Sequence, residues 1–460
     1  MSPRIAVIIS SLALSTAAPA QDTPTFAIDL EGGTQIQEFV ISVSDMKKTL
    51  TAFIEVMKWK IFDQGKADVS VARLWGLDTE TPVDQVLVGN AESKYGFIRL
   101  AEIKTDKKEL IRPGGRWWDT GGMFNFNVFF RDLEAAQLAL RQHGWSANSL
   151  MSTYERPNAS GKTMMMTGPD DIVMSFQQRI SRPMTGWPDF EGASHIEVGY
   201  QIVTDIKAWH DFYTQLLGFG SFGGVRELKD EKPVGPNVYG LPHNAVGFTD
   251  GWQANVKFRD KHEQSLGARQ FKTSTGYDFS SRANPPNLGI MTVRIPMKNI
   301  VALRDKLTAA KADMAADLQI VRLSPYGNVR ALAVRSPGGS GLWLELFEPG
   351  AEPMTESELK EFTQKGRYAT WTRFNNKLTG NVVWRPNGTA HVKWDQGTLD
   401  EEGTWTVKGD AVCTAWTRLR NNRELCVHHY RLAGDTTQSF TVDGRTDGIY
   451  SWTAAGENVK

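Results

Sequence analysis

The feature that most constrains the fold of this 460-residue chain is a unit that recurs four times along it. Each copy begins with a short apolar run typical of a strand, continues with an Asp or Asn, and then shows apolar residues at helical spacing. The Asp or Asn positions are Asp45, Asp132, Asp205 and Asn299. Such side chains can accept hydrogen bonds from the free N–H groups of a first helical turn. The recurrence therefore predicts one sheet-and-helix module built four times.

Two or three strand candidates follow each predicted helix. In the third copy, where the pattern is clearest, Trp209 and Leu216 lie on one helical face, and Gly218 suits the left-handed residue that ends a helix. The second and fourth copies end alike, with two apolar strands joined by turns at 167–171 and 336–340 that contain Pro and Gly. The predicted module is therefore βαβββ, and the predicted fold class is α+β.

Two motifs carry a family resemblance. The run Asp-Phe-Tyr-Thr-Gln-Leu-Leu-Gly-Phe at 211–219 and the Ser-Pro-Gly-Gly and Leu-Glu-Leu ending at 336–346 look like motifs of the vicinal oxygen chelate superfamily. This group contains glyoxalase I, extradiol dioxygenases and bleomycin-resistance proteins, and the resemblance covers residues 34–349. It implies that modules pair so that their curled sheets form cups. By this analogy, modules one and two form a cup over residues 34–182, and modules three and four form another over residues 190–349.

The resemblance also implies where a metal ion would bind. Enzymes of this superfamily usually hold a divalent cation with His, Gln or Glu from first strands and Glu from last strands, and the cation stabilises negative charge on the substrate. In modules one to four, the first-strand positions hold Glu38, Asn125, Val198 and Ile290, and the last-strand positions hold Arg99, Ser175, Asn255 or Lys257, and Glu345. Only Glu38 and Glu345 match in chemical type, and the expected pairing puts them in different cups. His195 lies just before the first strand of module three and would complete a partial site with Glu345 if a bulge turned it inward. The sequence therefore leaves open whether one divalent metal ion is bound, and the candidate ligands for it are Glu345 and His195.

The alternative for these two residues is a structural role. Glu345 would then pair with a cation such as Arg294 or Lys257, and His195 would hydrogen-bond locally at a strand entrance. Without a metal ion, each cup would remain a concave site suited to a small organic molecule. The residues expected to line the cups are Glu38, Arg99, Asn125, Asn127 and Ser175 in the first, and Tyr200, Arg294 and Trp343 in the second. Either set of polar groups would also be satisfied by a closed internal network.

The pattern changes after module four. From about residue 381, short strand candidates alternate with turn signals, which predicts a small antiparallel sheet or barrel over residues 366–456. This segment resembles, more weakly, small exported bacterial domains of lipocalin-like type. Cys413 and Cys426 lie in two of its strand candidates, and a disulfide between them would be worth about 3 kcal/mol by loop closure. The alternative is a pair of buried thiols.

The N-terminal residues have the pattern of a secretory signal. Arg4 precedes an apolar stretch of signal-peptide length at 5–14, and Ala-Pro-Ala at 18–20 suits cleavage before Gln21. Residues 1–20 are therefore predicted to be removed, and the protein is predicted to be secreted, most simply to a periplasm. An oxidising compartment of this kind favours disulfide formation.

Composition narrows the classes of partner. The 52 Lys and Arg balance 52 Asp and Glu, so there is no excess positive charge with which to neutralise a nucleic acid. No later stretch reaches the roughly eighteen apolar residues of a transmembrane helix. The expected partner is a small-molecule ligand or substrate, with a homodimer left open. Three functions remain: a metal-assisted lyase or dioxygenase, a metal-free binding or sequestering protein, and an interaction scaffold whose cups are filled by their own side chains.

Overall fold

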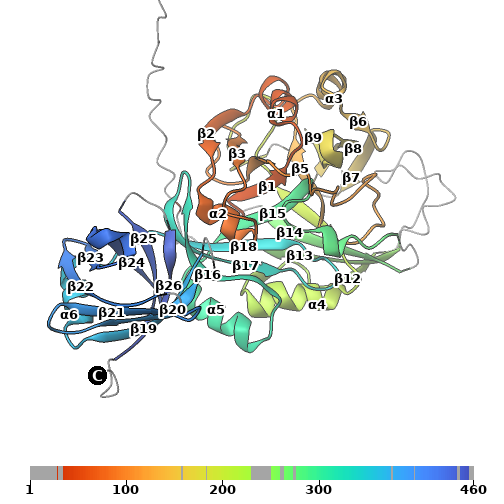
Figure 1. The fold of residues 1–460 in the computed structure, drawn as a ribbon. Coiled ribbons are helices and arrows are strands. Elements are labelled where there is room, and N and C mark those ends of the chain that lie inside the picture. The colour runs from red at the N-terminus through yellow and green to blue at the C-terminus, as the bar shows by residue number, and fades with distance from the viewer. Residues whose placement is uncertain are drawn as a thin grey trace, which may run out of the picture.

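The computed structural model describes residues 28, 35–156, 159–182, 184–228, 250–258, 264–272, 276–374, 377–397, 399–442 and 446–454. Figure 1 shows the modules in chain order, followed by a C-terminal barrel. Module one consists of β1 (Glu38–Ser42), α1 (Met46–Glu55), β2 (Lys60–Lys66), α2 (Val69–Leu74), β3 (Val83–Gly89) and β4 (Phe97–Ile103). Module two consists of β5 (Met123–Phe129), α3 (Leu133–Gln142), β6 (Ser146–Ala147), β7 (Ser152–Arg156), β8 (Ala159–Thr167), η1 (Pro169–Asp171) and β9 (Val173–Ser181).

Modules three and four repeat this order. Module three has β10 (Val198–Ile202), α4 (Ile206–Asp211), the π-helical turn η2 (Phe212–Leu216), β11 (Gly220–Ser221), β12 (Arg226–Leu228), β13 (Gly251–Lys257) and β14 (Ser265–Phe271). A short turn, η4 (Ser280–Arg282), leads to module four, which has β15 (Gly289–Pro296), α5 (Ile300–Ala309), β16 (Met314–Leu323), β17 (Gly327–Arg335) and β18 (Trp343–Pro349). The predicted α+β class with four βαβββ modules is confirmed, with short extra strands in modules two and three.

Three of the four predicted capping residues start helices as expected. The carboxylates of Asp45, Asp132 and Asp205 each accept hydrogen bonds from backbone N–H groups of the first turn, at 2.9 to 3.1 Å. Asn299 does not, because its backbone is left-handed, with φ at 52°, and its side chain makes no cap. There, Glu348 accepts a hydrogen bond from the Asn299 backbone N–H at 2.8 Å instead.

The modules pair differently from the expected arrangement. The eight-stranded first sheet has the order β16-β17-β18-β15-β1-β4-β3-β2, so it joins modules four and one. The second sheet has the order β11-β13-β14-β10-β5-β9-β8-β6, so it joins modules three and two. In each sheet the two first strands are antiparallel neighbours, β1 with β15 and β5 with β10. The expected cups over residues 34–182 and 190–349 therefore do not correspond to the two sheets.

One apolar core lies between the helix-facing sides of the two sheets. Phe39 on β1 and Phe126 on β5 meet there with ring centroids 5.6 Å apart. Phe53 of α1, Leu140 of α3 and Leu303 of α5 belong to the same buried cluster. Burying a side chain of this size contributes about 1.5–3 kcal/mol, so this shared core holds the four modules together.

The opposite side of each sheet is called its cup face here. Alternate residues of a strand point to opposite sides, so the first sheet presents Glu38, Val40 and Arg294 on its cup face. Helix α2, inserted between β2 and β3, covers this face: Leu74 and the adjoining Trp75 pack with Val40 in a second apolar cluster. The first cup is thus filled by the chain itself.

The C-terminal segment begins with α6 (Glu356–Thr363) and closes into an eight-stranded antiparallel barrel. Its strands are β19 (Arg367–Arg373), β20 (Thr379–Trp384), β21 (Thr389–Trp394), β22 (Asp400–Lys408), β23 (Ala411–Trp416), β24 (Leu425–Ala433), β25 (Thr436–Thr441) and β26 (Thr446–Ala454), with the turn η5 (Leu419–Asn422) before β24. The predicted antiparallel β domain is confirmed.

The barrel covers an edge of the first sheet. The side-chain amide of Gln438 accepts a hydrogen bond from the Ile320 backbone N–H at 2.7 Å and donates one to the Ile320 carbonyl at 3.1 Å. Because β16 is the edge strand, this amide pairs with both backbone groups as a neighbouring strand would. Tyr430 and Phe440 of the barrel pack against Ile320 and Ala351 beside this contact.

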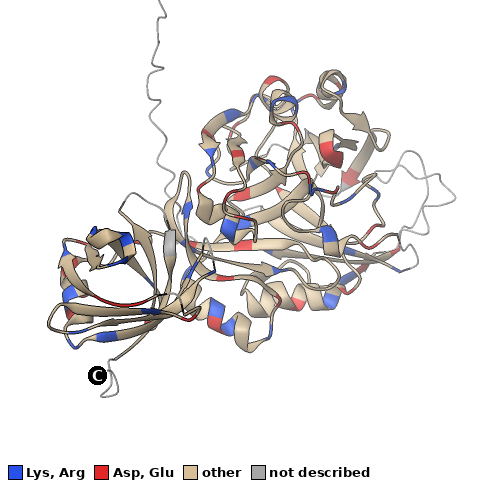
Figure 2. Cartoon of the chain, in the orientation of Figure 1, with Lys and Arg blue, Asp and Glu red and all other residues tan. Residues whose placement is uncertain are grey.

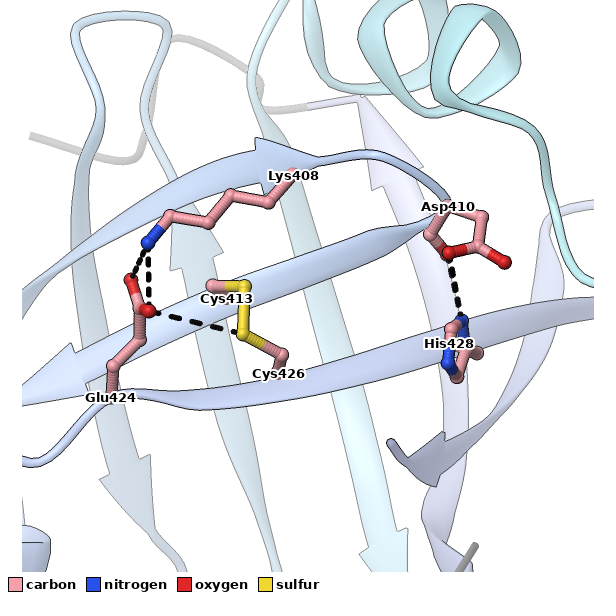
Figure 3. Close-up of a disulfide and its surroundings, with 6 residues drawn as sticks. All are labelled: Lys408, Asp410, Cys413, Glu424, Cys426 and His428. Atoms are coloured by element: carbon pink, nitrogen blue, oxygen red, sulfur yellow. Dashed lines mark hydrogen bonds and ion pairs between the residues drawn. A yellow bond between two sulfur atoms is a disulfide. The ribbon is translucent and has the colours of Figure 1, made fainter. Parts of the chain in front are cut away.

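Cys413 and Cys426 face each other on β23 and β24 and form the predicted disulfide, shown in Figure 3. With Glu424 they are the only set of three His, Cys, Asp or Glu ligand atoms that lie within 4.8 Å of one another in the described part of the chain. A disulfide sulfur is not a thiolate, and Lys408 Nζ lies 2.7 Å from the Glu424 carboxylate. The disulfide therefore cross-links two strands of the barrel, and this set of residues is not a metal site.

Charged residues of both signs are interspersed over the modules and the barrel, as Figure 2 shows. None of the helices in the described ranges has the length and apolar composition of a membrane-crossing segment. The predicted signal at residues 1–20 lies outside the described residues.

Candidate functional site

The cup face of the first sheet holds a buried ion pair between its neighbouring strands β1 and β4. Arg99 donates to the Glu38 carboxylate with Nε at 2.9 Å and with Nη2 at 2.7 Å. Its Nη1 donates to Asp63 at 3.0 Å. The Glu38 and Arg99 side chains are fully buried. Such a two-pronged contact is a strong form of carboxylate–guanidinium pair.

Arg294 joins this pair to the last strand of module four. Its Nη1 donates to Glu38 at 2.8 Å, and its Nε donates to Glu345 at 2.8 Å. The other Glu345 oxygen accepts a hydrogen bond from Trp75 Nε1 at 2.7 Å. Glu345 is thus partnered by Arg294, which was one of the two alternatives predicted for it. Lys257, the other, lies instead over the Phe222 ring of module three.

The charges around Glu38 hold it ionised. Burial by itself raises the pKa of this carboxyl, but the positive charges of Arg99 and Arg294 and hydrogen bonds from Arg99 and Tyr326 lower the pKa from 4.5 to about 2. The Tyr326 hydroxyl donates to Glu38 at 2.8 Å. Burial, together with the nearby Glu38 charge, raises the pKa of Tyr326 well above 10. Carboxylates, guanidiniums and a neutral phenol therefore form one network, which we call the ion cluster.

The ion cluster occupies the positions at which the family resemblance implies metal ligands. Glu38 and Glu345 both lie in the first sheet, so the expectation that they fall in different cups is wrong. Arg294, which pairs in register with Glu38, lies between the two carboxylates, whereas Ile290 packs into the helix-facing core beyond a bulge in the β1–β15 pairing. A guanidinium has no lone pair to offer a cation, and each carboxylate is already bonded to one. This donor set does not fit a divalent metal ion.

His195 lies in different surroundings from Glu345. It precedes β10 in the second sheet and is almost fully buried. Its ring packs against Trp187, with centroids 5.0 Å apart, and against Tyr95, with centroids 5.1 Å apart. Both Glu345 oxygens are bonded to Trp75 and Arg294. The geometry therefore gives Glu345 and His195 separate sets of neighbours.

The cup face of the second sheet has a different chemistry. Asn125 and Asn127 of β5, Ser175 of β9 and Tyr200 of β10 share it, because Asn125 pairs with Tyr200 and Asn127 pairs with Ser175 in register. Asn125 Nδ2 donates to Asn127 Oδ1 at 3.4 Å, whereas the buried Asn125 Oδ1 accepts no hydrogen bond from any residue in the described ranges. Four predicted lining residues are thus brought together, all of them uncharged.

Two further strands extend this surface with residues that the sequence analysis did not identify as lining. Gln253 of β13 donates to the Tyr200 hydroxyl at 3.3 Å and to Asn255 Oδ1 at 2.9 Å. Gly267 of β14 lies under the Tyr200 ring, and a Cβ there would lie 2.3 Å from a ring carbon. Arg269 lies on the same face of β14, two residues further along. The last strand of module three is thus β14, so the positions assigned to Asn255 or Lys257 lie on the preceding strand.

The remaining predicted lining residues belong to the filled first cup. Trp343 pairs in register with Thr292 and packs in the same apolar cluster as Val40 and Trp75. Glu38, Arg99 and Arg294 are held in the ion cluster. The signal that could have separated the two groups is charge, because two Glu and two Arg at buried positions require one another, whereas Asn, Ser and Tyr do not.

Comparisons with known proteins give only distant structural similarities. No protein-family model and no curated protein matches this chain. Glyoxalase I from Zea mays has 14% identity, covers 68% of this chain and 92% of its own, and has a TM-score of 0.44. A Mn(II)-bound glyoxalase from Novosphingobium aromaticivorans has 13% identity, 69% and 82% coverage and a TM-score of 0.23. A mutant 4-hydroxymandelate synthase from Streptomyces coelicolor has 12% identity, 72% and 96% coverage and a TM-score of 0.26. At such low identities and TM-scores, these similarities establish neither a metal centre nor a substrate for this chain.

Proposed function

We propose that this chain binds a small organic molecule on the cup face of the second sheet, without a metal ion. The observation that carries the proposal is the contrast between the two cup faces. In the first sheet, α2 covers the face and the ion cluster satisfies its charges. In the second sheet, amide and hydroxyl groups line the face, and Tyr200 and Gln253 keep part of their surface exposed. A ligand is expected where polar groups remain accessible.

The lining suggests which groups of a ligand would be recognised. Asn and Tyr side chains offer both donors and acceptors but no charge. The Asn125 Oδ1 acceptor calls for a ligand N–H or O–H, because a buried acceptor left without a donor costs about 1–3 kcal/mol. The proposed ligand of this face is therefore a polar molecule rather than a metal chelator.

Metal-assisted lyase or dioxygenase chemistry is not part of the proposal. It would need a Lewis acid held by carboxylate, imidazole or amide ligands around an open coordination position. In the first sheet, the implied positions hold Glu38, Arg99, Ile290 and Glu345, and each of the two carboxylates is bonded to an arginine. In the second sheet, the implied positions offer Asn125, Ser175 and Val198, which supply neither a carboxylate nor an imidazole. The donor chemistry of both faces supports binding rather than metal catalysis.

The test is a small-molecule screen by thermal unfolding of the full chain in the presence of EDTA. A ligand at one hundred times its Kd should stabilise the fold by about 2.7 kcal/mol. Asn125→Leu and Tyr200→Phe should each weaken that effect, because each removes a polar group from the second cup face. Thr292→Val is the matched control, since Thr292 lies on the first cup face, and it should leave the effect unchanged.

Three results would contradict this function. Stabilisation that requires a divalent cation and disappears with EDTA would restore the metal-dependent alternative. Stabilisation that persists in both Asn125→Leu and Tyr200→Phe would place the ligand elsewhere. If no compound stabilises the protein, the interaction-scaffold function is favoured instead.

We also propose that the protein works outside the cytoplasm. The signal-like pattern at residues 1–20 supports this, and so does the Cys413–Cys426 disulfide, because such bonds persist in oxidising compartments. The test is the N-terminus of protein recovered from fractionated cells. Export predicts a periplasmic or secreted protein that begins at Gln21, whereas an intact Met1 in the cytoplasmic fraction would contradict it.

A further inference from the structure

A separate pocket of about 580 Å³ lies where β5 and β9 end, beside the segment 184–190. Its volume is in the range of small-molecule sites. Arginines and apolar side chains dominate its lining, namely Arg131, Arg179, Arg182, Ile180, Trp187 and Phe190. With Asp189 as the carboxylate of the lining, the pocket carries an excess of positive charge.

Arg179 is the central feature of this pocket. Its guanidinium carbon lies 5.7 Å from the centroid of the Phe129 ring, and its Nε is fully buried without a hydrogen-bond partner. No carboxylate or carbonyl of the described residues accepts a hydrogen bond from this side chain. Taking a charged donor out of water without supplying an acceptor is costly. Arg179 as a whole is only partly buried, so its guanidinium charge is available to pair with an anion in the pocket.

Arg131, in the same pocket, has hydrogen-bond partners within the protein. Arg131 donates to the Phe190 carbonyl at 2.8 Å and pairs with the Asp189 carboxylate. Its guanidinium also lies over the Phe190 ring, 4.8 Å from the centroid. Asp189 therefore pairs with Arg131 and not with Arg179. An anionic ligand would supply a partner for the Arg179 charge.

Apolar surface surrounds this charge. Trp187 packs edge-on against Phe129 with ring centroids 5.3 Å apart, and it is only partly buried. Ile180 next to Arg179 is 58% exposed, which is unusual for a side chain of this type. A guanidinium that shares a pocket with an indole and an aliphatic side chain suits a ligand that joins an anionic group to a flat apolar body.

We propose that this pocket binds a small aromatic carboxylate, with its carboxylate on Arg179 and its ring against Trp187 and Ile180. This inference goes beyond the proposed function, because the pocket is a second site. Arg179 lies four residues beyond Ser175 along β9, which is about 13 Å in an extended strand. A molecule held by Asn125 and Ser175 would not reach it unless it were correspondingly long.

The test is isothermal titration of the full chain with 1-naphthoate and, separately, with the neutral 1-naphthamide. Naphthoate should bind at least about tenfold more tightly than naphthamide, since a charge-assisted bond to a guanidinium is stronger than a neutral one. Arg179→Gln should remove that preference. Arg141→Gln, which changes an exposed arginine of α3, should keep it.

Two more variants make the outcome decisive. Trp187→Leu should weaken both probes while leaving the preference for naphthoate, because it removes ring contact and not charge. Asn125→Leu should leave naphthoate binding unchanged, and loss of binding in this variant would move the ligand to the second cup face and overturn the inference. Equal binding of the two probes, no saturable naphthoate binding below about 10 mM, or an unchanged preference in Arg179→Gln would overturn it as well.

Discussion

The ion cluster makes a sharp prediction about stability, because Arg294 is its one link between Glu38 and Glu345. The variant Arg294→Leu removes two charge-assisted hydrogen bonds, each 2.8 Å long, from carboxylates that are fully buried or nearly so. Glu345 would keep only the Trp75 N–H, and Glu38 would keep Arg99 and Tyr326. Breaking a buried ion pair from one side costs about 3–5 kcal/mol, because a charge remains in the interior without its partner. This is a large part of a typical stability of about 5–15 kcal/mol.

A second substitution separates uncompensated charge from lost packing. Arg294→Leu with Glu345→Gln removes the orphaned carboxylate but keeps an oxygen that can accept from Trp75. The double variant should therefore be more stable than Arg294→Leu alone, by about 1–3 kcal/mol. Arg304→Leu is the matched control, because Arg304 makes a similar two-pronged contact with Asp317 on the surface. Exposed pairs of this kind contribute about 0–1 kcal/mol.

The assay is urea unfolding followed by tryptophan fluorescence, together with native-state hydrogen exchange of peptides that cover β1 and β15. Exchange is needed because the barrel and the modules can unfold separately, and a single transition would then mix them. The reasoning is refuted if Arg294→Leu costs no more than Arg304→Leu. It is also refuted if the double variant is less stable than Arg294→Leu, since the buried charge would then not be the source of the loss.

Three further predictions concern pH, the disulfide and the barrel contact. Because the pKa of Glu38 is lowered, ionised Glu38 contributes about 3 kcal/mol to the free energy of unfolding above pH 4.5, and this contribution is lost as the pH falls toward 2. Urea midpoints measured across that pH range should therefore fall less steeply in Glu38→Gln than in the unmodified protein. Reduction, or Cys413→Ser with Cys426→Ser, should destabilise the barrel by about 3 kcal/mol, read from its unfolding midpoint. Gln438→Leu should leave the Ile320 N–H and carbonyl without hydrogen-bond partners, which should cost about 1–3 kcal/mol of stability for each group. Faster proteolysis between the modules and the barrel would show the weakened contact.

Features that depend on near neighbours could be predicted from the sequence. The caps at Asp45, Asp132 and Asp205 involve groups no more than three residues away, so the local pattern contains the whole interaction. The Cys413–Cys426 bridge likewise joins two adjacent strands. The four modules and the antiparallel C-terminal domain follow from such local signals, because each unit is assembled from consecutive segments.

The pairing of modules could not be predicted in this way. Strands β1 and β15 are separated by most of the four-module region, and the apolar alternation of any first strand would suit any other. The discriminating information is electrostatic. Next to β15, Glu38 faces Arg294, whereas β5 carries no charged residue that could pair with it. An unpaired charge in a core is costly, so each buried Glu should lie next to a buried Arg. This requirement would have favoured the observed pairing of modules four and one.

The insertion of α2 explains why two sheets built from the same module differ in what they offer a ligand. Helix α2 fills the first cup with Leu74, and Trp75 at its end donates to the ion cluster. The same helix bears Arg73, which donates to Gln319 and to the Ile320 carbonyl on β16 and lies 3.8 Å from the centroid of the Phe374 ring. One short helix thus closes the cup and supports the strand on which the barrel docks. Helix α2 and the barrel contact occupy the first sheet, so the proposed ligand-binding role is assigned to the second sheet, where no such helix is inserted among the described residues.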